Sequence, residues 1–148
     1  MPLISIVVPL YNKERFIKET LDSVFNQTFL DYEIIIVDDG SNDNSASIVS
    51  EIKDPRITIF SNSNNGVSHA RNFGISKSNS DLIALLDGDD LWETNHLENL
   101  YTLYKSYPNC GLFAAAYYKK YFNGRKIKAN YNGVCLLYTS DAADDGTG

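Results

Sequence analysis

The sequence has little of what several common classes of binding protein need. Its 13 Lys and Arg residues are outnumbered by 19 Asp and Glu residues, giving a formal net charge of −6. This balance argues against a domain built to grip a nucleic-acid backbone, so we expect no nucleic-acid partner. No stretch approaches the roughly 18 apolar residues of a spanning helix. The start, Met-Pro-Leu-Ile-Ser, lacks the basic and apolar segments of a secretion signal. We expect a cytoplasmic protein, and peripheral contact with the inner face of the membrane stays open.

Cysteine and histidine are also scarce, with two of each: Cys110, Cys135, His69 and His96. Neither cysteine has a partner at a spacing typical of a metal or redox site, so both are expected to be reduced thiols. No G-x-G-x-x-G pattern follows the first apolar run, and no G-x-x-x-x-G-K-[ST] loop occurs. These absences disfavour dinucleotide binding and P-loop chemistry.

Short apolar runs alternate with segments of helical periodicity. The runs at 4–10, 33–38, 57–60, 82–87 and 112–118 read as strands, because polar alternation is almost absent from them. Helices are predicted from 13 to about 26, around 48–52, over 67–76 and around 97–104, with Asn12 as the cap of the first. This alternation predicts an α/β fold with a mainly parallel sheet flanked by helices.

The chain is long enough for one domain with a substantial core. We place that domain at 1–134 and expect it to be incomplete at its C-terminal side. Residues 135–148 are small, acidic and aperiodic. They read either as non-native sequence or as a flexible native tail.

Polar residues follow three of the predicted strands, where the ligands of open parallel sheets bind. The cluster Asp87-Gly88-Asp89-Asp90 ends the fourth strand. Carboxylates suit hard cations such as Mg²⁺ and Mn²⁺, and alternate carboxylates at a strand end can face one ion. Gly88 would permit an unusual backbone angle and close approach of a ligand. The competing interpretation is an acidic turn leading into a helix.

Two further strand ends carry candidate binding residues. Asp38 and Asp39 end the second strand, and a carboxylate there can bond a base or ribose, although Asp39 could equally cap a helix. Tyr11 follows the first strand and could stack on a nucleobase or simply pack at the core edge.

A glycine loop at Gly66 precedes the helix that carries Arg71. Helix N-termini favour phosphate, and Arg71 could contact either a phosphate or the acidic cluster. A plain surface ion pair is the alternative for Arg71.

Five segments in this order resemble the opening of inverting family-2 glycosyltransferases. They are Val7-Val8-Pro9-Leu10-Tyr11-Asn12, Ser23-Val24-Phe25-Asn26-Gln27-Thr28, Ile36-Val37-Asp38-Asp39-Gly40-Ser41, Gly66-Val67-Ser68-His69-Ala70-Arg71-Asn72 and Leu86-Asp87-Gly88-Asp89-Asp90. The resemblance spans about 3–107. It implies the Rossmann-like nucleotide-binding half of a glycosyltransferase-A fold, a UDP-sugar-type donor, Mn²⁺ or Mg²⁺, and a carbohydrate or lipid-linked acceptor in polysaccharide synthesis.

The resemblance also implies individual roles. The donor would be held by Pro9, Tyr11, Asn12, Asp39, Gly66, Arg71, Asp87 and Gly88, and the metal by Asp89 and Asp90. Pro9 and Tyr11 would line the base pocket, and Asp39 would bond the base. The family's general base lies well beyond its donor half, so no residue here is assigned that role.

Two other readings stay open at the sequence level. The chain could bind nucleotide and metal without completing a transfer. The acidic pair at Val37-Asp38-Asp39 also occurs in phosphoacceptor signalling domains, although these carry it on the first strand.

Overall fold

The structure is a computed structural model that describes residues 1–120 and 124–128. The chain divides into two compact units, 1–96 and 97–148. The first unit alternates strands and helices: β1 (Ile4–Leu10), α1 (Ile17–Phe25), β2 (Tyr32–Asp38), α2 (Ser45–Glu51), β3 (Ile57–Ser61), α3 (Val67–Ser76) and β4 (Leu82–Leu85). The second unit holds α4 (His96–Ser106), which begins one residue before it, β5 (Tyr118–Lys120) and β6 (Lys126–Lys128).

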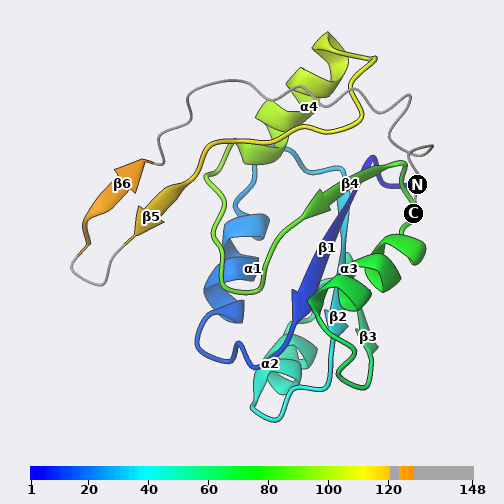
Figure 1. Ribbon diagram of the computed structural model, residues 1–148, viewed down its shortest axis with the longest axis vertical. Helices are drawn as coiled ribbons and strands as arrows, with labels where there is room; N and C mark the ends of the chain where they lie inside the picture. The colour runs from blue at the N-terminus through cyan, green and yellow to red at the C-terminus, as the bar shows by residue number, and fades with distance from the viewer. Residues whose placement is uncertain (121–123, 129–148) are drawn as a thin grey trace, which may run out of the picture. The chain divides into compact units, whose positions relative to one another are not determined.

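The first unit is built on a parallel four-stranded sheet of order β3-β2-β1-β4 (Figure 1). Val7 of β1 lies opposite Ile35 of β2 on one side and Leu85 of β4 on the other. The chain adds β2 and β3 on one side of β1 and then crosses to place β4 on the other. The gap beyond the carboxyl ends of β1 and β4 is therefore a topological switch point, where ligands of such sheets bind.

Both faces of the central strands are covered, which explains why their sequences are continuously apolar. Every residue of β1 is buried. Val7, Ile35 and Val37 pack with Ala70 of α3 on one face. Because side chains alternate along a strand, Ile6, Val8, Ile34 and Ile36 point to the opposite face, and all four are fully buried.

At Gly74, α3 lies close against the sheet. A Cβ added there would lie 2.4 Å from Val7 Cγ1 and 3.3 Å from Val37 Cγ2. A glycine weakens a helix intrinsically, but here it permits the helix to lie directly on β1 and β2. The predicted helix over 67–76 is thus confirmed, with a packing reason for its glycine.

Three local predictions were wrong. The first helix begins at Ile17, with Phe16 at its N-cap, so Asn12 does not cap it. Asn12 instead has a φ of 52°, and its Oδ1 accepts a hydrogen bond from the Asn42 amide at 2.8 Å. Its side chain therefore joins two loops. The fourth strand ends at Leu85, two residues early.

The predicted strand at 112–118 was also wrong. Residues 111–117 form no strand, and only Tyr118 enters the short antiparallel pairing of β5 with β6. The run contains three consecutive alanines, which have low β-propensity, and strand propensity acts mainly through packing on neighbours. Leu112 and Tyr117 are both exposed, so that packing is missing here. The predicted boundary at 134–135 lies outside the described residues.

Candidate functional site

A cavity of about 350 Å³ opens at the carboxyl ends of β1, β2 and β4 in the first unit. This volume falls within the range of small-molecule sites. Its lining comes from four places in the chain: the end of β1 and the loop after it, the end of β2, the start of α3, and the loop after β4. The lining residues are Pro9, Leu10, Tyr11, Lys13, Asp39, Val67, Ala70, Asp87, Gly88 and Asp89.

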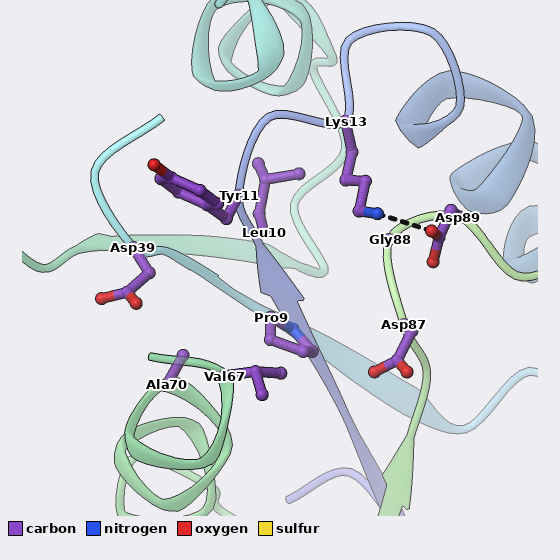
Figure 2. A pocket seen from close by; sticks show the side chains of 10 residues that line it. All are labelled: Pro9, Leu10, Tyr11, Lys13, Asp39, Val67, Ala70, Asp87, Gly88 and Asp89. Atoms are coloured by element: carbon purple, nitrogen blue, oxygen red, sulfur yellow. Dashed lines mark hydrogen bonds and ion pairs between the residues drawn. The ribbon is translucent and has the colours of Figure 1, made fainter. Parts of the chain in front are cut away.

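The cavity has two chemically different ends, as Figure 2 shows. Tyr11 and Asp39 lie at one end, Lys13, Asp87 and Asp89 at the other, and Pro9 between them. The Tyr11 side of the site is accessible, since 40% of that residue is exposed. An aromatic ring with one carboxylate stands opposite a group of charged side chains.

Asp39 is the best-anchored polar residue of the cavity. One carboxylate oxygen accepts the Asn65 amide at 2.9 Å and the other accepts the Gly66 amide at 2.7 Å. Its own amide donates to the Leu10 carbonyl at 2.8 Å. Only 3% of Asp39 is exposed. Asp39 therefore fixes the entrance to α3 against the end of β1, and each oxygen keeps a second lone pair for a ligand.

Gly66 supplies the backbone geometry of that entrance. It has a φ of 91° and stands at the N-cap of α3 without a side-chain cap. Its amide donates to Asp39, so one of the four amides at the start of the helix that lack an intrahelical partner is bonded to a carboxylate. Asp39 therefore does not cap α2, the helix that follows it, and instead bonds the loop that leads into α3.

Two cations pair with two of the three carboxylates in the acidic loop after β4. Arg71 Nη2 contacts Asp87 Oδ1 at 2.6 Å, and Lys13 Nζ contacts Asp89 Oδ2 at 2.5 Å. Arg71 thus contacts the acidic cluster, one of the two options predicted for it. All four side chains stay partly exposed.

Asp90 differs from its neighbours. Burial raises the pKa of its carboxyl, and the negative charges of Asp89 and Asp87 raise it further, while Lys13 opposes this. Concentrated negative charge of this kind is what a divalent cation relieves.

The acidic cluster fits a divalent cation that is also bound by substrate phosphates. Among residues 1–120 and 124–128, no group of three or more His, Cys, Asp or Glu side chains is arranged to hold a metal ion. Mg²⁺ in nucleotide sites is commonly held by one or two carboxylates together with substrate phosphates. Asp89, which lines the cavity, and its neighbour Asp90 fit this second arrangement.

Not every predicted site residue lines the cavity. Pro9, Tyr11, Asp39, Asp87, Gly88 and Asp89 do, whereas Asn12, Gly66, Arg71 and Asp90 do not. Three of the latter act through lining residues or their loops. Gly66 bonds Asp39, Arg71 bonds Asp87, and the Asp90 amide donates to the Asp87 carbonyl at 3.0 Å.

The prediction of an unusual backbone angle at Gly88 was wrong, since its φ is not positive. A Cβ there would meet the Pro9 carbonyl and Lys13 Cγ at 3.4 Å, an ordinary contact. The Gly88 carbonyl accepts a hydrogen bond from buried Thr20 Oγ1 at 3.1 Å, which ties the loop to α1.

Sequence reasoning missed Leu10, Lys13, Val67 and Ala70 as lining residues. Lys13 is the most consequential omission. Its position directly after Tyr11-Asn12 could have indicated that Lys13 lies at the same edge of the sheet. Its reach to Asp89, 76 positions away, becomes visible only in three dimensions.

Comparison with known proteins agrees with this geometry. The family model of Glycosyl transferase family 2 matches residues 5–143. The chain therefore belongs to glycosyltransferase family 2, and its parallel sheet with flanking helices is the nucleotide-binding portion of a glycosyltransferase-A fold.

Several relatives share this segment. The uncharacterized glycosyltransferase EpsJ of Bacillus subtilis is 46% identical over 92 residues, covering 61% of this chain and 27% of that protein. WfgD of Escherichia coli, a UDP-Glc:alpha-D-GlcNAc-diphosphoundecaprenol beta-1,3-glucosyltransferase, is 39% identical, covering 65% of this chain and 38% of its own length. The chain thus spans well under half the length of these relatives.

Two solved structures have the same architecture. Staphylococcus aureus TarS 1-349 in complex with UDP-GlcNAc has a TM-score of 0.67 and 25% identity, covering 72% of this chain and 32% of that one. The mannosyltransferase PcManGT of Pyrobaculum calidifontis, in complex with GDP-Man and Mn²⁺, also has a TM-score of 0.67 and 25% identity, covering 74% and 34%. Within the described part of the chain, no helix is long and apolar enough to cross a bilayer.

Proposed function

We propose that the cavity binds a nucleotide-sugar donor, a UDP-sugar first of all. The sugar would pass to a hydroxyl of a carbohydrate or lipid-linked acceptor with inversion, in the synthesis of cell-surface or extracellular polysaccharide. One observation carries this proposal. A single cavity has Tyr11 and Asp39 at one end and Asp87 and Asp89 at the other.

The two ends match the two ends of a nucleoside diphosphate. The half-exposed Tyr11 ring offers a stacking surface for the base, with Pro9 beside it. Asp39 offers a carboxylate oxygen to a base N–H, held in place by its bonds to the Asn65 and Gly66 amides. Because these bonds fix the carboxylate, little reorganisation is needed when a ligand arrives.

The charged end would take the ribose and the diphosphate. Asp87, held by Arg71, would face the ribose side, and Asp89 with Asp90 would hold Mn²⁺ or Mg²⁺. A bound divalent cation would neutralise charge that develops on the departing diphosphate. The complexes of PcManGT with GDP-Man and Mn²⁺ and of TarS with UDP-GlcNAc support a metal and a nucleotide sugar in relatives of this fold.

The transfer itself would be a substitution at the anomeric carbon. The acceptor oxygen forms its bond to that carbon from one face while the bond to the diphosphate oxygen breaks on the other, which inverts the centre. The acceptor proton passes to a general base. We assign no residue of this chain as that base. The name of WfgD, which pairs UDP-Glc with a diphosphoundecaprenol-linked acceptor, supports a lipid-linked acceptor.

Isothermal titration calorimetry with UDP, with and without Mn²⁺, tests the donor site. We expect binding that strengthens when Mn²⁺ is present, and weaker binding of uridine, which can occupy only the base end. A folded sample that gives no heat with UDP under either condition would overturn the donor-site proposal.

A second candidate is that this chain binds donor and metal without completing a transfer. The lining of the cavity accounts for donor and metal binding, and no residue of this chain is assigned as a general base. A sugar-transfer assay with UDP-sugars separates the two candidates. Donor binding without product supports the binding role, and product formation supports the enzyme.

A further inference from the structure

Lys13 and Asp89 form an ion pair at the charged end of the cavity. The Nζ–Oδ2 distance is 2.5 Å, and the side chains are 34% and 40% exposed. Lys13 comes from the loop after β1 and Asp89 from the loop after β4 (Figure 2). Both residues line the cavity, so the pair lies where a diphosphate and a divalent cation would bind.

The backbone of Lys13 is fixed although its side chain is not enclosed. Its amide donates to Ser45 Oγ at 2.7 Å, and its carbonyl accepts the Phe16 and Ile17 amides, each at 2.9 Å. A lysine ammonium is a point charge on a flexible four-carbon stem. Lys13 can therefore change its partner by rotating its side chain, without moving the loop.

Arg71 provides the contrast. It pairs with Asp87 from α3 and does not line the cavity. The Arg71 guanidinium can stay paired with Asp87 while a ligand is bound. Lys13, by contrast, neutralises the very carboxylate that a cavity-bound cation needs.

We propose that Lys13 is an exchangeable counter-ion of the donor site. It neutralises Asp89 while the cavity holds no donor. When Asp89 ligates a divalent cation, Lys13 releases Asp89 and donates its ammonium to an oxygen of the diphosphate. This inference rests on the proposed donor site.

The exchange has a thermodynamic consequence. Lys13 competes with a cation that arrives alone, but it assists a cation that arrives together with a diphosphate. The two ligands should therefore bind with positive coupling, and Lys13 should supply part of it.

The test compares wild type with Lys13→Met, which removes the charge and keeps most of the stem. Mn²⁺ affinity without nucleotide is measured by the electron paramagnetic resonance signal of free Mn²⁺, and UDP affinity in Mn²⁺ by calorimetry. We expect Lys13→Met to bind Mn²⁺ about two- to fivefold more tightly, the range of a partly exposed ion pair. We expect UDP to bind about tenfold more weakly, as for a lost hydrogen bond between charged groups.

Lys18→Met is the matched control, because Lys18 is an exposed lysine of α1. It should change neither affinity. Crystal structures without metal and with UDP and Mn²⁺ should show the Lys13–Asp89 contact only in the former.

The outcomes distinguish a failure of the counter-ion role of Lys13 from a failure of the donor site. If wild type binds UDP with Mn²⁺ but Lys13→Met leaves Mn²⁺ affinity unchanged or weaker, the counter-ion role is wrong and the donor site stands. The same conclusion follows if the ion pair persists in the UDP complex. If wild type binds no UDP, the donor site itself is wrong.

Discussion

At the scale of single residues, the aspartates that line the cavity differ in how firmly they are held. Asp39 is almost fully buried and bonded to backbone amides of another loop. Asp89 is partly exposed and bonded only to a flexible lysine among the contacts of the described chain. Substitutions at these two aspartates should therefore have different consequences, although both lie in one cavity.

Asp89→Asn should lower the Mn²⁺-dependent affinity for UDP by well over tenfold. The change removes one charged ligand from a hard cation while it keeps the size of the side chain. Calorimetry in Mn²⁺ measures the effect, with Asp22→Asn on the exposed face of α1 as the control. Unchanged affinity in a folded Asp89→Asn variant would mean that the cluster is only a turn.

Gly74→Ala should overpack the core at a cost of about 1–3 kcal/mol, which leaves a net loss of stability of up to about 2 kcal/mol. The helix-propensity gain of alanine over glycine is about 1 kcal/mol and is outweighed, because the new Cβ would lie 2.4 Å from Val7 Cγ1. Urea unfolding measures the change.

The double variant Gly74→Ala/Val7→Ala gives the control for this contact. The two positions touch, so the double variant should lose less stability than the sum of the single variants. Strict additivity would show that the helix moves away from β1 instead of clashing with it.

At the scale of elements, the site is assembled where loops from four places are bonded to one another. The Asp39 carboxylate joins the end of β2 to the start of α3, and the Asn12 side chain joins the loop after β1 to the loop before α2. Thr20 of α1 holds the loop after β4. These cross-bonds position the cavity, since none of the loops contains regular structure of its own there.

Asp39→Asn should loosen the entrance to α3. An amide keeps one acceptor oxygen, so one of the two bonds to the Asn65 and Gly66 amides is lost. Those amides should exchange with deuterium about tenfold faster or more, as expected for the loss of about 1.5 kcal/mol from a charge-assisted bond. UDP affinity should fall as well.

Asp43→Asn is the matched comparison, because Asp43 accepts the Ser45 amide at the start of α2. It should speed exchange at Ser45 and leave Asn65 and Gly66 unchanged. If both variants affected the same amides, the loosening would be general and not specific to α3.

Asp54 and Arg56 make the stability of the loop before β3 depend on pH. Hydrogen bonds from the Arg56 side chain hold the pKa of Asp54 below its usual value of 3.8, against an opposing effect of burial. A carboxyl with a lowered folded pKa stabilises the fold above its unfolded pKa, and that contribution is lost as pH falls through the folded pKa. Asp54→Asn should therefore cost about 1 kcal/mol at pH 7.

The difference between wild type and Asp54→Asn should shrink as pH falls below about 3.8 and into the range of the lowered pKa. Urea unfolding at a series of pH values measures it. A difference that stays constant down to pH 2 would show that the Asp54 charge is not the cause.

At the scale of the whole molecule, the described fold needs no metal for its core. The buried cluster on the α3 face is apolar, and Arg71 and Lys13 pair with two of the three carboxylates of the acidic loop. Chelation should therefore leave the melting temperature unchanged. UDP should raise the melting temperature when Mn²⁺ is present and much less when it is chelated, since the stabilisation by a ligand grows with the logarithm of its concentration divided by its Kd. A melting temperature that falls on chelation alone would contradict this separation.

The sequence was sufficient to predict the parallel sheet and the edge at which its polar residues meet. Continuous apolar runs and aspartates at their ends are local signals. The structure has the parallel sheet that the runs predict, and aspartates line the cavity at its edge. It was insufficient where a residue's role depends on a distant partner. Neither the packing role of Gly74 against Val7 nor the reach of Lys13 to Asp89 has a local signature. The error at 112–118 has the same origin, because strand formation there required a neighbour.

The short edge strand β4 has a consequence for how the site would come apart. Within the described residues, β4 pairs only with β1 over four positions, whereas β1 and β2 pair over seven. Sub-global opening begins at such weakly paired edges. Transient detachment of β4 would displace Asp87 and Asp89, the residues of the proposed diphosphate end, and leave Tyr11 and Asp39 on the central strands. The proposed nucleoside end would then persist during local opening, and the proposed diphosphate end would form only while β4 is paired with β1.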